Sequence, residues 1–237
     1  MLPLMRTLII FALFIPGLWT MPAAQATEGS ESDAGPRFSN PRAITHPCLP
    51  LQSLKRDILK SKDERVERAA RPDLHKTFRI GNQTVEALTV EDREFVHGKL
   101  SEVALDYFAQ ADDGTVYYLG EDVDQYRDGK VTGHEGAWLF GKQTQQLGVL
   151  LPAHPKVGDR FRSEDVPGVT REDDEVLSVS ETVTVGAGTY RNCVKIKEHL
   201  SDGKIEYKFY APNIGCVKEA ESHGALELQA HEVQTDR

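Results

Sequence analysis

Residues 194–211 read VKIKEHLSDGKIEYKFYA, two runs of alternating apolar and polar side chains on either side of Asp202-Gly203. An Asp-Gly pair between such runs is typical of a β-hairpin, because both central residues of a two-residue turn need positive φ. With the turn at 201–204, Glu198 is predicted to lie opposite Tyr207 and Ile196 opposite Phe209. One face of this hairpin is then apolar except for Glu198, and the other face is polar.

Three more pairs that end in glycine, His97-Gly98, Asp113-Gly114 and Asp128-Gly129, separate strand-like runs in the middle of the chain. Because such pairs favour hairpin turns, we expect an antiparallel meander there. Half-buried antiparallel strands suit a curved sheet, a barrel or a sandwich, so the predicted fold class is mainly β. One segment departs from this pattern, since the spacing of the apolar residues in 51–59 is typical of an amphipathic helix.

The first 26 residues have the pattern of a cleaved secretory signal. Arg6 precedes an apolar run over 8–18, and Ala24-Gln25-Ala26 offers the small-x-small pattern that signal peptidase recognises. A membrane-spanning helix needs roughly 20 apolar residues, so the length of this run disfavours the alternative of an uncleaved anchor. The sequence therefore predicts a periplasmic or extracellular protein with no stable membrane insertion after cleavage.

Composition divides the rest of the chain into three parts. Residues 27–44 are rich in Ser, Gly, Pro and charged side chains, which predicts a flexible leader that buries too little surface to offset its ordering entropy. Residues 45–232 are predicted to form a single β-rich domain, and 233–237 a C-terminal tail.

The chain is acidic, with 28 Lys and Arg against 37 Asp and Glu and a formal net charge of −9. An acidic protein repels phosphate backbones and anionic lipid surfaces, so nucleic acid is not an expected partner. The expected partner is a small ligand or an envelope component of unknown identity.

Three cysteines, Cys48, Cys193 and Cys216, permit at most one intramolecular disulfide. In a straight strand the predicted register separates Cys193 from Cys216 by roughly 13 Å. A disulfide needs Cα atoms within about 7 Å, so a Cys193–Cys216 bond requires a sharp fold at 211–215. Buried apolar thiols and a bonded pair both stay open. A reactive thiol would need a neighbouring base that the sequence does not place.

Residues 124–135, DQYRDGKVTGHE, have most of the spacing of a twelve-residue calcium loop, with Asp124 first, Asp128 fifth and Glu135 last. The third position brings no carboxylate, and a hairpin turn at Asp128 explains the same residues without a metal. The pair His134-Glu135, close to an aromatic residue, is the most site-like combination in the chain. The candidate metal ligands are Asp124, Asp128, His134 and Glu135, and the sequence identifies no cofactor and no catalytic residue.

Two stretches resemble a family of exported bacterial β-rich proteins of unknown function. DYFAQADDGTVYYLGE (106–121) is similar to the family pattern D-x-Y/F-A-Q-D-x-x-G-x-V-x-Y-x-G-E, and EYKFYAPNIGCVKE (206–219) is similar to its closing Y-Y-A-P-G-x-G-x-V-K-E. HPCLPL (46–51) is similar to the opening N-P-Y-x-P-L. The resemblance implies strands, not a helix, in 51–60. Cys48 and Cys216 stand where the family has an aromatic and an apolar residue.

Aromatic residues crowd the predicted curved sheet and define the first functional hypothesis. A non-catalytic exported protein would bind a ligand or envelope component in the concavity of the sheet, although the same aromatics would equally fill a core. The alternatives are a metal-dependent hydrolase that uses His134 and Glu135, and a structural or interaction module of the envelope without a pocket. The candidate ligand-binding residues are Tyr107, Tyr117, Trp138, Tyr207 and Phe209.

Overall fold

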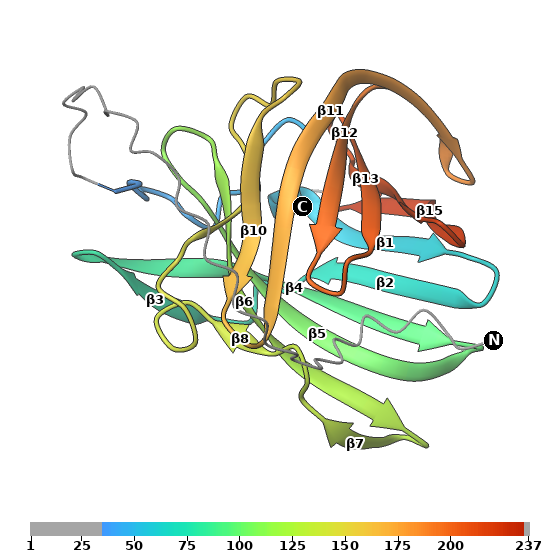
Figure 1. Cartoon of the computed structure of the whole chain (residues 1–237), viewed down its shortest axis with the longest axis horizontal. Coiled ribbons are helices and arrows are strands. Elements are labelled where there is room, and N and C mark those ends of the chain that lie inside the picture. The colour runs from blue at the N-terminus through green and yellow to red at the C-terminus, as the bar shows by residue number, and fades with distance from the viewer. Residues whose placement is uncertain (1–34, 235–237) are drawn as a thin grey trace, which may run out of the picture.

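The computed structural model describes residues 35–234, which form a single domain built on one antiparallel sheet of 15 strands (Figure 1). The predicted mainly β fold is confirmed. The predicted signal segment (1–26), the first part of the leader (27–34) and the last residues of the tail (235–237) lie outside the described residues. The elements are η1 (Leu51–Ser53), β1 (Leu54–Lys60), β2 (Glu64–Ala70), β3 (Lys76–Ile80), β4 (Gln83–Val96), β5 (Lys99–Gln110), β6 (Val116–Arg127), β7 (Lys130–Gly133), β8 (Trp138–Leu139), β9 (Gly148–Leu151), β10 (Arg160–Val166), β11 (Thr170–Val185), β12 (Gly188–Leu200), β13 (Ile205–Ala211), β14 (Gly215–Glu221) and β15 (Gly224–Val233).

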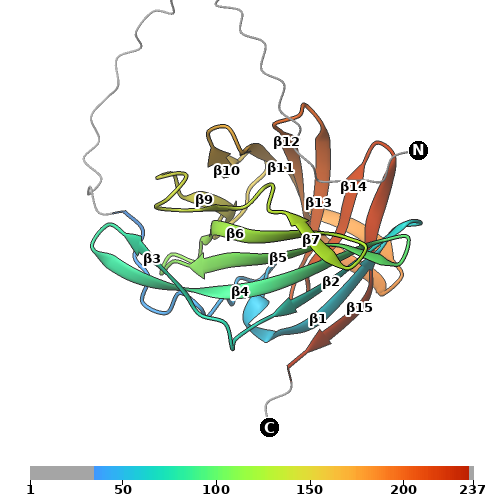
Figure 2. The same ribbon diagram turned by 90° about the horizontal axis from the view of Figure 1, so that it is seen from below.

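The sheet curls but stays open. Its order is β10-β11-β12-β13-β14-β15-β1-β2-β4-β5-β6-β7, with β3 paired to β4 and with β8 and β9 paired to β6. Figure 2 shows β4, β5 and β6 lying across the molecule while β12, β13 and β14 stand at a steep angle to them. Within residues 35–234 no ladder joins the two ends, so the sheet is a curved open one and not a closed barrel.

Four glycine-containing turns shape the hairpins as predicted, but in two ways. His97-Gly98 and Asp128-Gly129 are two-residue turns in which both residues have positive φ. At Asp113-Gly114 and Asp202-Gly203 only the glycine has positive φ, and the loop is one residue longer. That extra residue changes the pairing of the strands that follow.

The register of β12 with β13 therefore differs by one residue from the prediction. Glu198 pairs with Glu206, not with Tyr207, because the loop Ser201–Gly203 is closed by the amide of Leu200 donating to the carbonyl of Lys204 at 3.0 Å. A shift of one residue moves every side chain of a strand to the other face. Tyr207 and Phe209 leave the face that holds Glu198, and Glu206 and Lys208 join it.

Most of the segment 51–60 is the strand β1, as the resemblance implied, and the amphipathic helix indicated by its apolar spacing is wrong. Only η1 is helical, and β1 forms ladders with β15 on one side and β2 on the other. Two ladders satisfy the backbone groups of β1 more completely than a short, isolated helix would.

The end of the predicted flexible leader packs on the domain. The Asp112 amide donates to the Arg37 carbonyl at 2.8 Å, the Phe38 amide donates to Gln83 Oε1 at 3.0 Å, and Ile44 is fully buried. Residues 35–44 therefore belong to the fold, which corrects the predicted boundary at 45. Among residues 35–234, no helix is long and apolar enough to cross a bilayer.

The main core fills the concave side of the sheet. Its members come from both ends of the sheet, for example Val176 on β11, Ile196 on β12 and Phe108 on β5. Tyr107, next to Phe108, belongs to a second cluster on the opposite face of β4, β5 and β6. A third cluster lies where the tip of the long β11–β12 hairpin, bent over in Figure 1, reaches β15 and the Ala187 amide donates to the Leu228 carbonyl at 2.9 Å.

The two ends of the sheet meet at a seam between β9 and β10. A Cβ atom on Gly148 would lie 1.9 Å from the carbonyl oxygen of Ser163, so only glycine permits this approach of the two backbones. The hydroxyl of Thr144 donates to the Asp165 carbonyl at 2.8 Å and covers part of the free edge of β10. We call this line of contact the β9–β10 seam.

We predict that Gly148→Ala destabilises the protein by about 2 kcal/mol, because the added methyl must push the β9 and β10 backbones apart. Gly224→Ala is the matched control, since Gly224 also lacks positive φ and its Cβ would meet nothing within 4 Å. Its effect should stay under about 1 kcal/mol. Urea unfolding of both variants checks this, and equal effects would contradict the tight seam.

Candidate binding site at the seam

An open depression of about 330 Å³ lies at one end of the β9–β10 seam. This volume is near the lower end of the range of about 300–1,000 Å³ that is typical of small-molecule binding pockets. A smaller one of about 60 Å³, next to Gly148, lies further along the same seam. The residues that line the larger depression are Thr115, Tyr117, Val149, Pro152, Asp159, Arg160 and Phe161.

The depression combines apolar walls with a polar rim. Tyr117 belongs to the outer cluster and makes an edge contact with Phe38, with 5.7 Å between ring centroids. Phe161 packs against the concave core. Arg160 pairs with Glu175 at 3.3 Å and is held at the rim. An apolar ligand body would therefore contact rings from both sides of the sheet.

His46 fixes the chain beside the depression. It is buried, its Nδ1 accepts from the Cys48 amide at 3.1 Å, and its Nε2 donates to the carbonyl of Pro152 at 3.1 Å. This arrangement requires the neutral ring, and burial lowers the pKa of His46. His46 is thus a positioning residue for the Pro152 wall of the depression.

A buried carboxylate lies beside Phe161, on the neighbouring strand. Asp174 on β11 is opposite Phe161 in the ladder and only 3% exposed. A bulge in β10 at Ser163 turns the Ser163 amide toward Asp174. This amide donates a hydrogen bond to Oδ2 of Asp174 at 3.0 Å. Oδ1 of Asp174 is buried without a hydrogen-bond partner among residues 35–234.

Asp174 begins a row of acidic side chains that crosses three neighbouring strands. It pairs in the ladder with Glu198, which pairs with Glu206, and directly opposed residues share a face. Lys208, also on β13, lies 2.8 Å from Oε2 of Glu198. We call the three carboxylates Asp174, Glu198 and Glu206, together with the Lys208 that pairs with Glu198, the acidic row.

A second charged group continues around the concave face. Arg68 forms a bidentate salt bridge with Asp92, with Nε–Oδ1 at 3.0 Å and Nη2–Oδ2 at 2.7 Å. Its Nη2 also lies 3.4 Å from Oε1 of Glu219. Buried carboxylates on this face thus outnumber the cations that pair with them. Among residues 35–234, the buried carboxylates on this face are Asp57, Asp92, Glu164, Asp174, Glu198, Glu206 and Glu219, and the basic side chains that pair with some of them are Arg68, Lys208 and His231.

The excess negative charge shifts the protonation of the acidic row. Burial, reinforced by the nearby Glu172 carboxylate, raises the pKa of Asp174 to about 7. Burial also raises the pKa of Glu198, and the opposing pull of Lys208 is offset by Glu172, Asp174 and Glu206. Since a buried charge needs a partner, these acids either keep a proton or take a cationic partner.

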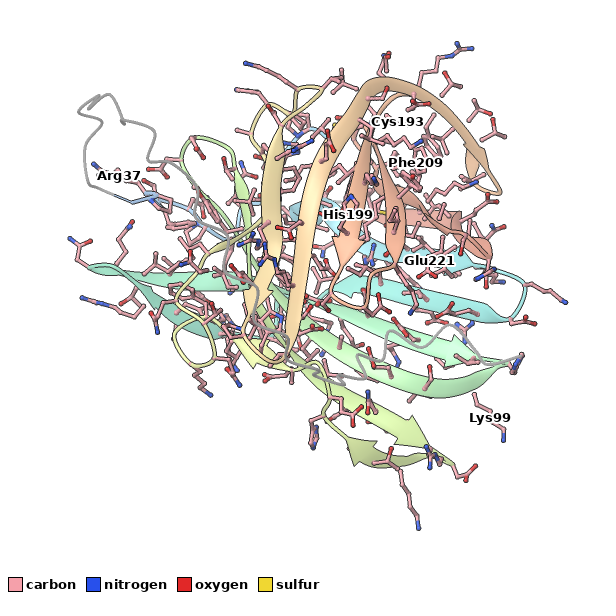
Figure 3. All side chains as sticks on the ribbon, viewed as in Figure 1. Arg37, Lys99, Cys193, His199, Phe209 and Glu221 are labelled. Atoms are coloured by element: carbon pink, nitrogen blue, oxygen red, sulfur yellow. The ribbon has the colours of Figure 1, made fainter. Side chains whose placement is uncertain are left out.

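The five predicted ligand-binding aromatics are not brought together. Tyr117 lines the depression, whereas Trp138 is buried in the concave core with its Nε1 donating to Glu164 at 3.2 Å. Tyr107 is buried in the outer cluster and donates to Asp122 at 2.6 Å. Tyr207 and Phe209 lie on the other face of β13, next to Lys195. The distance from Lys195 Nζ to the ring centroid is 4.7 Å for Tyr207 and 5.5 Å for Phe209, which is labelled in Figure 3.

The predicted metal ligands are only partly neighbours. Nδ1 of His134 lies 2.9 Å from Asp124, and it also lies 2.8 Å from the Val123 carbonyl. Asp128 sits in the β6–β7 turn, four residues from Asp124 and hence roughly 13 Å along the strand. The hairpin, not a calcium loop, accounts for the sequence around Asp128. Among residues 35–234, no three His, Cys, Asp or Glu side chains are grouped to hold a metal ion.

All three cysteines are free thiols. Cys193 on β12 and Cys216 on β14 are separated by β13, about two strand spacings or roughly 9.6 Å, which is too far for the predicted bond. Cys216 is buried with its Sγ 3.7 Å from Glu219. Burial and this carboxylate raise the pKa of Cys216, so the thiol is not activated for attack.

Sequence reasoning missed Phe161, His46 and most of the acidic row, although it placed Glu198 on an otherwise apolar face. The DDE run at 173–175 was visible but its alternation gave no sign that the middle acid points inward. Comparisons of the chain with protein-family models, with curated proteins and with solved structures found no match. The site itself must therefore carry the functional argument.

We predict that the free energy of unfolding falls as pH rises from about 5 to 7. The pKa of Asp174 is about 7 in the folded state and close to 4 when unfolded, so the native state binds more protons in this window. Linkage makes this slope at most about 1.4 kcal/mol per pH unit for one group. Asp174→Asn should reduce the slope and be more stable than the parent protein at pH 8.

Asp173→Asn is the matched control for this prediction, measured by urea unfolding across the same pH range. Asp173 is adjacent on the chain but pairs with Arg162 and Arg171 on the other face, and its pKa is lowered, so it titrates below the window. This control should keep the slope. An Asp174→Asn variant with the parental slope would contradict the buried, proton-binding position of Asp174.

Proposed function

We propose that this protein is an exported, non-catalytic binding protein that holds a small ligand with an apolar body in the depression at the β9–β10 seam. The observation that carries the proposal is the depression of about 330 Å³ in which Tyr117 and Phe161 come from opposite sides of the sheet. The site is preformed, as expected for a binding protein. Export rests on the signal-like sequence of residues 1–26, and membership of the exported family rests on the two motifs.

The seam also offers a reason for leaving the sheet open. A closed ladder between β9 and β10 would bring the backbones to about 4.8 Å along their whole length. Here the backbones approach at Gly148, and the depression lies beyond the end of that contact. The seam therefore combines a close backbone contact at Gly148 with an open depression beside it.

The other functional hypotheses have less support from the geometry. For a metal-dependent hydrolase, the described residues include no group of three side chains that could hold the metal, and of the predicted ligands Asp124 is the one that contacts His134. For a purely structural module, the depression and the unpartnered carboxylate oxygen of Asp174, the ladder partner of Phe161, would have no role. Ligand binding gives both features a use.

We predict that 2-phenylethanol, a neutral probe with an aromatic body, binds at the seam. In ¹⁵N-resolved NMR titrations the amides of Thr115, Tyr117, Val149 and Phe161 should shift most. Phe161→Ala should weaken binding about tenfold, because a buried aromatic contact is worth more than about 1 kcal/mol. Shifts that centre elsewhere, or no saturable shifts, would contradict the proposal.

Phe209→Ala is the matched control for this experiment. Phe209 is a half-buried phenylalanine of the same sheet, but it lies on the outer face of β13 beneath Lys195. The control variant should bind the probe as the parent does. Equal loss in both variants would indicate a general loss of structure and not a site at Phe161.

A further inference from the structure

We propose that the ligand of the seam carries a protonated amine, which Asp174 binds, while its apolar body occupies the depression. This inference rests on the proposed function and adds the chemical class of the ligand. Two independent observations support it. They are the unpartnered Oδ1 of Asp174 and the position of Asp174 directly across the ladder from Phe161.

The geometry of Asp174 leaves one acceptor for a ligand. Its Oδ2 is engaged by the Ser163 amide, and Oδ1 is buried without a partner in the described part of the chain. A buried carboxylate oxygen without a donor is costly, and an ammonium group would supply both the hydrogen bond and the charge. A ligand amine would therefore gain most at this atom.

The charge around Asp174 favours a cation over a neutral donor. The groups that face it are Glu172 on its own strand, Ser163 on β10, Glu198 on β12 and Lys208 on β13. Lys208 is already held 2.8 Å from Glu198. The local balance is negative, so a cation is attracted and an anion is repelled.

The depression matches the rest of such a ligand. Phe161, Tyr117 and Val149 supply apolar surface, and ammonium ligands also interact favourably with aromatic ring faces. Arg160 at the rim is paired with Glu175, so its charge is partly offset. The expected ligand is therefore a small primary amine with an aromatic or aliphatic body, not a bare metal ion.

The test compares three probes of similar shape on the folded protein by calorimetry and NMR at pH 8. They are 2-phenylethylammonium, 2-phenylethanol and 3-phenylpropanoate. We expect the ammonium probe to bind at least about tenfold more tightly than the alcohol, since hydrogen bonds to charged groups are stronger than neutral ones. Equal affinities, or tightest binding of the carboxylate, would overturn the inference and leave the proposed function intact.

Two variants test whether Asp174 causes the tighter binding of the ammonium probe. Asp174→Asn should abolish the advantage of the ammonium probe while the alcohol still binds, and Asp173→Asn should preserve the advantage. A preference that survives in Asp174→Asn would overturn the assignment to Asp174. Failure of all three probes to bind at the seam would overturn the proposed function itself, so the two failures are distinguishable.

The pH dependence gives a second readout. An alkylammonium stays charged up to about pH 10, so any change of its affinity below pH 8 comes from the protein. Because a proton competes for Asp174, binding at pH 5.5 should be about thirtyfold weaker than at pH 8 in the parent. The dependence should disappear in Asp174→Asn. A parent affinity that does not change with pH would contradict the inference.

Discussion

Gly203, with φ of 84°, makes the β12–β13 connection a three-residue loop, and this loop determines which side chains of β13 lie on the concave face of the sheet. It aligns Glu198 with Glu206 and places Lys208 on the same face. In the alternative register these positions would be occupied by Tyr207 and Phe209, while Asp174 and Glu198 would stay on the concave face. One turn thus decides whether β13 adds Glu206 and Lys208 or two aromatic rings to this face.

The charges have an energetic consequence that links stability to binding. Among the described residues, seven buried carboxylates share this face with Arg68, Lys208 and His231, and burial raises the pKa of both Asp174 and Glu198. Carboxylates without full compensation reduce stability at high pH, and such costs are commonly found at functional sites. A cationic ligand would offset the same charge, which connects the acidic row to the depression at the seam.

The sequence was informative where structure depends on local residues. The mainly β fold, the four hairpins and the strand at 51–60 could be predicted, because glycine-containing pairs and alternation are local signals. The register at Ser201–Gly203 could not, since an Asp-Gly pair fits both a two-residue and a three-residue loop. The depression could not be predicted from the sequence either, because only the tertiary fold brings Tyr117, Val149 and Phe161 together from three strands.

The register of β12 with β13 is the central claim, and cross-strand NOEs measure it most directly. The account predicts contacts that pair Glu198 with Glu206 and Ile196 with Lys208. NOEs that instead pair Glu198 with Tyr207 would contradict it, because Glu206 and Lys208 would then leave the concave face. In that case the acidic row would lose Glu206 and Lys208, and only the pair of Asp174 and Glu198 from the β11–β12 ladder would remain.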